Sequence, residues 1–362
     1  MTDTATPASR NPQVATPETS MKAVGYARCL PADHPEALLD IMLPRQQPGA
    51  TDLLIAVHAV AVNPVDTKIR RTVAPAEGEH QVLGWDAAGI VLAVGAAVTR
   101  FRPGDRVWYA GAVQRPGSNS ECQLVDERIA GHMPASLSFA EAAAMPLTTV
   151  TAWELLFERL QVARTRQHAQ AGRSGQSLLV IGAGGGVGSM LIQLARQLTD
   201  LTVIATASRP ETAQWVRDLG AHEVIDHRLP LSGELARIDH PQVSHVASLT
   251  ATHQHFAEIV ACLAPQGRLA LIDDPEPLDI RLLKRKSLSL HWEFMFTRSL
   301  FGTDDMAVQH DILEEVAGLV DAGVLRTTLA AHFGLINAAN LRRAHALLES
   351  GQARGKIVLE GF

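Results

Sequence analysis

Cysteine is scarce in this sequence, which has only Cys29, Cys122 and Cys262 among 362 residues. The three positions lie far apart along the chain, so they do not form a disulfide framework. This excludes the class of small secreted domains that depend on disulfides, and it favours a reducing compartment. We therefore expect a cytoplasmic protein.

Long apolar runs, a strong charge bias and internal repeats are also missing. No stretch approaches the ~20 apolar residues of a membrane-spanning helix, and the N-terminus lacks the apolar core of a signal peptide. The net charge of −6 argues against nucleic acid as a partner. With 46% hydrophobic and 19% charged residues, the composition is that of a soluble globular protein with neither a membrane nor a nucleic-acid partner.

The length of the chain predicts more than one domain. A chain of 362 residues exceeds one ordinary hydrophobic core, so two domains are expected. Residues 1–20 are rich in Thr, Pro, Ala and Ser and show no hydrophobic periodicity. We expect them to form a disordered tail, with the ordered protein beginning at Met21.

The most informative stretch runs from Ser177 to Ala195, with the sequence SLLVIGAGGGVGSMLIQLA. Its apolar start predicts a buried strand, its glycines a tight turn, and its amphipathic end a helix. Glycine is needed there because a diphosphate must contact backbone N–H groups at the helix N-terminus, where a Cβ would block it. The stretch therefore predicts a dinucleotide site formed by Gly182, Ala183, Gly185, Gly186, Val187 and Gly188.

The rest of the chain divides around this glycine corner. Before it, short strands punctuated by Gly and Pro predict a compact barrel-like β domain. After it, strands alternate with helices, which is typical of a doubly wound parallel sheet. The sixth strand of that sheet is expected at residues 288–296. A last strand at residues 356–359 breaks the alternation, and we expect it to return to the first domain.

Five segments in this order resemble motifs of the medium-chain dehydrogenase/reductase superfamily, near its zinc-type alcohol dehydrogenase-like and quinone oxidoreductase branch. They are NPVDTKIR at 63–70, GWDAAG at 84–89, FRPGDRV at 101–107, AAAMPLTTVTAW at 142–153, and the glycine corner. The resemblance covers nearly all of residues 21–362. It implies an α/β protein with a GroES-like β-barrel domain (21–150 and 297–362) and a Rossmann domain with a doubly wound parallel sheet (151–296).

The resemblance does not extend to the zinc ligands of the family. Where zinc alcohol dehydrogenases have Cys, His and Cys, this chain has Asn63, Trp85 and Leu147. Catalytic zinc needs three protein ligands and an open position, which these side chains do not supply. The cysteine-rich structural zinc loop is also missing, since residues 110–125 contain only Cys122. We therefore expect no metal.

The cofactor is predicted from the end of the second strand of the doubly wound sheet. An NAD-specific site carries Asp or Glu there, about 20 residues beyond the glycines, whereas this chain reads Ala207-Ser208-Arg209. A hydroxyl and a guanidinium can bind a 2′-phosphate that a carboxylate would repel. We predict NADPH, with Ser208 and Arg209 reading the phosphate; the alternative is that Arg209 is a solvated residue at a helix start.

The resemblance implies further site residues. Thr149 and Thr151 would face the nicotinamide and its ribose, Thr250 would lie at the end of the fourth strand, and Phe294 to Phe296 would lie near the carboxamide. The alternative for the threonines is helix capping, and for Phe294 and Phe296 it is core packing. The candidate catalytic residues are Asn63 to hold the acceptor, Lys68 to stabilise or protonate an enolate, and Tyr109 as a second proton donor, whereas Asp66 is expected to be structural.

Three functions remain open at this point. The first is a zinc-independent NADPH oxidoreductase that acts on a small molecule, either a quinone or an α,β-unsaturated carbonyl compound. The second is a zinc-dependent alcohol dehydrogenase with an atypical metal site. The third is a non-catalytic NADPH-binding redox sensor or structural protein. The family's habit of pairing its sixth strand across a two-fold axis also predicts a homodimer, which would cover an apolar sheet edge.

Overall fold

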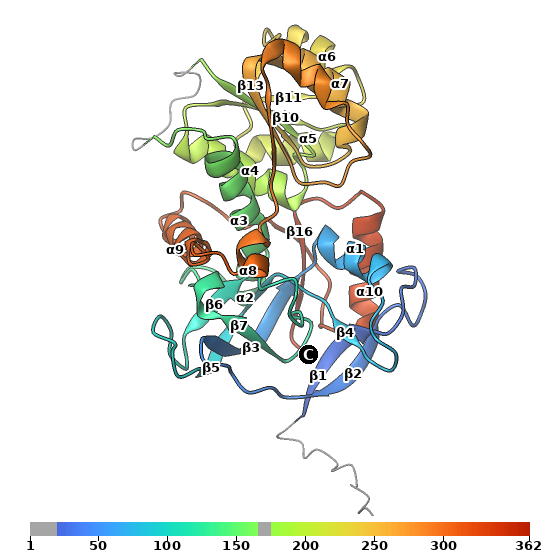
Figure 1. The fold of residues 1–362 in the computed structure, drawn as a ribbon, viewed down its shortest axis with the longest axis vertical. Coiled ribbons are helices and arrows are strands. Elements are labelled where there is room, and N and C mark those ends of the chain that lie inside the picture. Colours follow the sequence, from blue (N-terminus) through green and yellow to red (C-terminus); the bar gives the residue numbers. More distant parts are fainter. Residues whose placement is uncertain (1–19, 166–174) are drawn as a thin grey trace, which may run out of the picture.

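The computed structural model describes residues 20–165 and 175–362, and Figure 1 shows them as an upper and a lower part joined by helices and strands. The tail predicted for residues 1–20 therefore lies, except for Ser20, outside the described residues. None of the described helices has the length and apolar character needed to cross a membrane.

Strands from both ends of the chain form the lower part. A three-stranded sheet has the order β2-β1-β4, and a second sheet has the order β15-β16-β3-β5-β6-β8, with β7 also paired to β3. The strands are β1 Ser20–Tyr26, β2 Leu39–Pro44, β3 Asp52–Ala61, β4 Gln81–Val82, β5 Ala87–Val94, β6 Arg106–Tyr109, β7 Cys122–Asp126, β8 Ala130–His132, β15 Leu329–His332 and β16 Lys356–Glu360. This is the predicted GroES-like β domain.

β3 organises this part because it is apolar along nearly its whole length. It pairs with β5, β7 and β16, and the side chains of Leu53 and Ile55 are completely buried. Burial of each such side chain contributes about 1.5–3 kcal/mol. The pairing of β16 with β3 confirms that the last strand of the chain returns to the first domain.

A six-stranded parallel sheet forms the upper part, with the order β11-β10-β9-β12-β13-β14. Its strands are β9 Ser177–Ile181, β10 Thr202–Thr206, β11 Glu223–Ile225, β12 Val243–Ser248, β13 Leu263–Leu271 and β14 Ser289–Trp292. The strand order reverses between β9 and β12, and in such sheets ligands bind beyond the carboxyl ends of the strands at that point. The predicted Rossmann-like sheet is confirmed.

Helices connect the strands of both parts. They are α1 Pro64–Thr72, α2 Phe139–Ala143, α3 Pro146–Trp153, α4 Gly186–Leu198, α5 Pro210–Asp218, α6 Leu231–Arg237, α7 Thr252–Cys262, α8 Thr297–Phe301, α9 Val308–Asp321 and α10 Ala338–Glu349, with the shorter turns η1 Glu127–Ile129, η2 Glu154–Arg159 and η3 Ile280–Lys286. Ser138 and Glu141 form a capping box at the start of α2, the pattern that their three-residue spacing favours.

One helical segment, formed by α3 and η2, contacts both parts of the molecule. α3 packs against α4 of the upper part, and η2 continues it as a π-helix. Single π-turns within helices are uncommon and are often found at functional sites. The same helical segment therefore contacts both parts of the molecule.

The predicted sixth strand is shorter than expected, which corrects the range 288–296. β14 ends at Trp292, although the N–H of Glu293 still donates to the carbonyl of Leu271 at 2.9 Å. The chain then turns, with the N–H of Thr297 donating to the carbonyl of Phe294 at 2.9 Å, and enters α8. Phe294 and Phe296 consequently lie in a turn rather than in the edge strand.

Candidate functional site

The glycine corner lies between the end of β9 and the start of α4. Gly182 has a φ of +79°, a conformation that favours glycine, and a Cβ there would lie 2.9 Å from Cγ2 of Thr250. A Cβ on Gly188 would lie 2.5 Å from the carbonyl oxygen of Ala183, so this glycine lets α4 pack tightly on the turn. Gly185 differs, because a Cβ there would meet only the carbonyl oxygen of Gly182, at 3.6 Å.

The start of α4 is suited to a diphosphate. The first helical hydrogen bond in the corner runs from the N–H of Ser189 to the carbonyl of Gly185, at 2.9 Å. The N–H groups of Gly186, Val187 and Gly188 precede it, and such groups at a helix N-terminus have no partner within the helix. Together with the open space beside Gly185, they form a cradle that fits an anionic diphosphate.

The three predicted threonines differ in burial and in hydrogen bonding. Thr149 is completely buried, and among the described residues no partner is found for its hydroxyl. The hydroxyl of Thr151 donates to the carbonyl of Leu147 at 2.8 Å, so it is engaged within its own helix. Thr250 is exposed and lies beside Gly182. Thr149 is therefore the threonine whose unsatisfied hydroxyl suits a ligand.

Ser208 and Arg209 lie between the end of β10 and the start of α5. Arg209 occupies the N-cap position of α5, and its guanidinium donates to the carbonyl of Gln352 at 3.2 Å. Its Nε lies 3.7 Å from the Glu211 carboxylate, and both side chains are substantially exposed. Such contacts are weak, so the guanidinium can be turned toward an anion.

The two predicted phenylalanines differ in exposure. Phe296 is buried and packs edge to face against Trp85 with a ring centroid distance of 6.4 Å, whereas Phe294 is 47% exposed. Trp85 is itself buried, and its indole N–H donates to the carbonyl of Ala112 at 3.1 Å. The turn that contains Phe294 and Phe296 therefore packs against a residue from one of the sequence motifs of the lower part.

A buried charged cluster adjoins the glycine corner. The Nζ of Lys356, at the start of β16, lies 2.9 Å from Oδ2 of Asp86 and donates to the carbonyl of Val62 at 2.9 Å. The Asn63 side chain bridges the pair, because its Nδ2 donates to Asp86 at 3.0 Å while its Oδ1 accepts from Lys356. The aliphatic part of Lys356 lies against Gly186. A Cβ added to Gly186 would lie 2.8 Å from the Cδ atom of Lys356.

Burial dominates the electrostatics of this cluster. It raises the pKa of the Asp86 carboxyl, and the Lys356 ammonium opposes that shift. Burial also raises the pKa of Asp66 to about 7, against the backbone N–H groups of Asn63 and Gly84 that donate to it. Asp66 forms the N-terminal capping box of α1 with Asn63, which is the structural role expected of it.

The predicted catalytic residues are not brought into one group. Both ends of the Asn63 amide are engaged in the Lys356 cluster, an arrangement that favours a positioning role over direct contact with an acceptor. Tyr109 is completely buried, burial raises the pKa of its phenol, and among the described residues its hydroxyl has no partner. Such a phenol is a poor proton donor.

Lys68 lies on α1 and reaches the upper part of the molecule. Its Nζ lies 2.7 Å from Oδ2 of Asp274, which follows β13. The lysine side chain is 51% exposed and that of Asp274 is 78% exposed, so the pair contributes little stability and separates easily. The ammonium therefore spans the two parts without being committed to a buried partner.

The sequence analysis missed Lys356 as a site residue. The available signal was a lysine directly before the apolar run Ile357–Leu359, which places a charge where burial is expected. Its partners Asn63 and Asp86 lie in segments remote in sequence, so only the pairing of β16 with β3 brings them together.

The residues at the positions of the family's zinc ligands also meet in this cluster. The N–H of Leu147 donates to Oδ1 of Asp86 at 2.9 Å, beside Asn63 and following Trp85. An amide, an indole and an alkyl side chain do not fit zinc, and the one carboxylate is paired with Lys356. Within residues 20–165 and 175–362, no group of three His, Cys, Asp or Glu side chains could hold a metal ion.

The known proteins to which this chain is similar are dehydrogenases and oxidoreductases. Residues 49–154 match the alcohol dehydrogenase GroES-like domain, and residues 219–359 match a family described as zinc-binding dehydrogenase. A zinc-type alcohol dehydrogenase-like protein of Staphylococcus aureus is 36% identical over 343 residues, which cover 94% of this chain and 99% of that protein. A quinone oxidoreductase of Pseudomonas aeruginosa is 30% identical over 320 residues, covering 86% of this chain and 92% of that protein.

One solved structure is more similar still. It is a protein from Rhizobium etli CFN 42, provisionally named a zinc-dependent alcohol dehydrogenase, with 55% sequence identity and a TM-score of 0.89. The match covers 95% of this chain and 99% of that chain.

Two glycine substitutions should separate the packing role of the corner from its ligand role. Gly188→Ala forces a Cβ against the Ala183 backbone and should lower the melting temperature clearly. Gly185→Ala meets open space, so it should leave the melting temperature within about 1 °C while weakening dinucleotide binding about tenfold or more. Thermal unfolding and fluorescence titration with NADPH measure the two effects. Unchanged NADPH affinity in Gly185→Ala would show that the diphosphate does not lie there.

Proposed function

Because the chain belongs to the medium-chain dehydrogenase/reductase superfamily of oxidoreductases, we propose that it is a zinc-independent, NADPH-dependent enzyme that reduces quinones or α,β-unsaturated carbonyl compounds. The observation that carries this proposal is the Lys356–Asp86–Asn63 cluster. Its Asn63 stands at the position of one of the family's zinc ligands, and its Lys356 pairs with Asp86 and lies directly against the glycine corner. The similarity to a quinone oxidoreductase supports the acceptor class.

The chain's residues have separate tasks in this proposal. The start of α4 holds the diphosphate, Thr149 offers an unsatisfied hydroxyl toward the nicotinamide side, and Ser208 with Arg209 binds the 2′-phosphate. NADPH, when bound, supplies a hydride to the acceptor. A reaction of this kind depends on positioning more than on a strong acid.

Lys68 is the candidate residue for stabilising the negative charge that develops on the acceptor. As hydride reaches the β-carbon of an enone, negative charge moves to the carbonyl oxygen, and an ammonium aimed at that oxygen lowers the barrier. The exposed contact with Asp274 holds Lys68 between the two parts and can be exchanged for the acceptor at low cost. Proton transfer from Lys68 or from solvent would complete the reduction.

A screen of NADPH oxidation across quinones, enals and enones, with and without EDTA, tests the proposed function. We expect turnover with at least one of these acceptor classes and no loss of activity on chelation. Activity that is lost with EDTA and restored by zinc would favour an alcohol dehydrogenase with an atypical metal site. NADPH binding without turnover on any acceptor would favour the redox sensor or structural protein.

Arg209→Ala should raise the Michaelis constant for NADPH about tenfold or more while leaving that for NADH nearly unchanged, because a charge-assisted contact to the 2′-phosphate is lost. Arg217→Ala is a matched control, since Arg217 is an exposed arginine in the last turn of the same helix. An equal loss with both cofactors would show that Arg209 does not bind the phosphate.

Lys68→Met should lower turnover with enones about 10²–10³-fold and turnover with quinones less, because a hydroquinone spreads its charge over the ring. Asp274→Asn is the control, since it removes the partner of Lys68 and keeps the ammonium. It should retain enone turnover. Full enone activity in Lys68→Met would show that the ammonium does not act on the acceptor. An equal loss in Asp274→Asn would show that Lys68 matters only through its ion pair with Asp274.

We also propose a homodimer through the edge strand β14. β14 is the last strand in the order of the parallel sheet, and Trp292 at its end and Phe294 just beyond it are 53% and 47% exposed. A second copy would pair the free strand edge and cover these side chains. Sedimentation of wild type and of Leu290→Pro tests this: a monomeric wild type would contradict the dimer, and a dimeric variant would place the interface elsewhere.

A further inference from the structure

A short segment of the lower part lies against the glycine corner and the start of α5. It consists of residues 350–355, which join α10 to β16, and we call it the connecting segment. The N–H of Gly355 donates to the carbonyl of Gly184 at 2.9 Å, and Gly355 also forms a parallel bridge with Gly185. The connecting segment therefore contacts the predicted dinucleotide site directly.

Gly355 permits this close approach. Its φ is +52°, and a Cβ there would lie 3.0 Å from Cζ2 of Trp215 and 2.6 Å from the carbonyl oxygen of Thr328. Trp215 belongs to α5, and its indole N–H donates to the hydroxyl of Ser189 on α4 at 2.8 Å. The connecting segment therefore packs where α4 and α5 are joined.

Two arginines reach across this contact in opposite directions. Arg354 of the connecting segment lies over the ring of Trp215, with its Cζ 5.3 Å from the ring centroid, and its Nη1 donates to the carbonyl of Glu211 at 3.4 Å. Arg209, at the N-cap of α5, donates to the carbonyl of Gln352 at 3.2 Å. Each guanidinium contacts the backbone of the other's segment, so both cations lie where the connecting segment meets the start of α5.

The charges at this point do not cancel. The carboxylate in these contacts is that of Glu211, whose Oε1 lies 3.7 Å from Nε of Arg209, and it accompanies two guanidiniums. The contacts of Arg209 and Arg354 with carbonyl oxygens are long and involve neutral acceptors, so they are weaker than contacts with an anion. The N-terminus of α5 adds a partial positive charge. The region therefore favours a bound anion.

The side chain of Thr212 gives a second indication of a ligand. Thr212 is the third residue of α5 and is only 8% exposed, yet among the described residues no partner is found for its hydroxyl. Its Cγ2 lies beside Gly184, because a Cβ added to Gly184 would lie 2.4 Å from that atom. A buried hydroxyl without a partner is costly, so it suits a site where a ligand supplies the missing hydrogen bond.

We propose that Arg354 is a further specificity-determining residue for the 2′-phosphate of NADPH, contributed by the lower part of the molecule. This rests on the proposed function, in which Ser208 and Arg209 bind that phosphate. A phosphate monoester carries about −1.5 to −2 charges at pH 7, and its oxygens can accept from two guanidiniums at once. Arg209 binds the phosphate from the upper part and Arg354 binds it from the lower part. The connecting segment is then held to α5 more firmly with NADPH than with NADH.

Binding of two adenosine fragments tests the role of Arg354 without catalysis. Adenosine 2′,5′-bisphosphate and adenosine 5′-monophosphate differ only in the 2′-phosphate, and calorimetry measures both dissociation constants. Arg354→Ala should weaken binding of the bisphosphate about tenfold and binding of the monophosphate less than about twofold, because a charge-assisted contact is lost. Arg354→Lys should recover part of the loss, since it keeps the charge but not the planar guanidinium.

Arg343→Ala is the matched control. Arg343 belongs to α10 and lies over the ring of Phe333 in the lower part, with its Cζ 5.0 Å from the ring centroid. The control removes an arginine from an aromatic ring, as Arg354→Ala does, and it should leave both dissociation constants unchanged. An equal loss of both fragments in Arg354→Ala would show that Arg354 acts through packing on Trp215 or on the 5′-phosphate side, and would overturn the inference.

A variant that combines Arg209→Ala with Arg354→Ala separates this inference from the proposed function. If both arginines bind the same phosphate, the combined variant should bind the two fragments with nearly equal affinity. A preference for the bisphosphate that Arg354→Ala retains in full would overturn the inference and leave the proposed use of NADPH intact. A wild type without any preference for the bisphosphate would overturn both.

Hydrogen exchange of residues 350–356 measures the contribution of the lower part. With each cofactor at saturation, wild type should exchange about threefold or more slowly in this range with NADPH than with NADH. In Arg354→Ala the two cofactors should give equal exchange. Equal exchange with NADPH and NADH in wild type would contradict binding of the phosphate from the lower part.

Discussion

The buried ammonium of Lys356 is the interaction on which the arrangement of the site depends. It brings β16 to Asp86 and Asn63 of the lower part, and its aliphatic part lies against Gly186 at the start of α4. The neighbouring Gly355 donates its N–H to the carbonyl of Gly184 at 2.9 Å. Removing one partner of a buried ion pair typically costs ~3–5 kcal/mol, so Lys356 is held firmly in place. The Gly355 hydrogen bond and the packing of Lys356 on Gly186 then join the glycine corner to the same strand.

This cluster connects segments that, in the zinc alcohol dehydrogenases of the same superfamily, carry zinc ligands. A bound zinc ion would supply positive charge and fix the segments that carry its ligands. Here the Lys356 ammonium neutralises Asp86, and the Asp86 carboxylate holds the N–H of Leu147 at 2.9 Å. The segments around residues 63, 86 and 147 are therefore connected by a hydrogen-bonded ion pair, and a metal is not required to hold them together.

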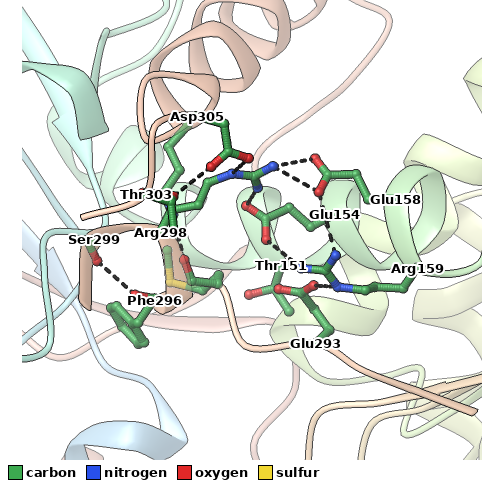
Figure 2. Close-up of polar contacts among 12 residues, drawn as sticks. Thr151, Glu154, Glu158, Arg159, Glu293, Phe296, Arg298, Ser299, Thr303 and Asp305 are labelled. Carbon is green, nitrogen blue, oxygen red and sulfur yellow. Dashed lines mark hydrogen bonds and ion pairs between the residues drawn. The ribbon is translucent and has the colours of Figure 1, made fainter. Parts of the chain in front are cut away.

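The helical segment of α3 and η2 connects this site to a second group of charged side chains, which includes Glu154, Glu158 and Arg298. At its α3 end it carries Thr149, and at its η2 end Glu154 and Glu158 hold Arg298 (Figure 2). Arg298 lies on α8, which follows the turn after β14. One helical segment therefore contacts Asp86 through Leu147 at its start and Arg298 through Glu154 near its end.

The sequence by itself determined the elements whose signals are local. The glycine corner, the capping box of Ser138 and Glu141, and β3 at Asp52–Ala61 follow from residues close together in the chain. What only the tertiary structure decided depends on charges that meet across long separations. The hydrogen bonds of the Asn63 amide and the burial of Lys356 result from such pairs. Periodicity reports which face of an element is apolar, but it does not report which distant charge will stabilise a buried one.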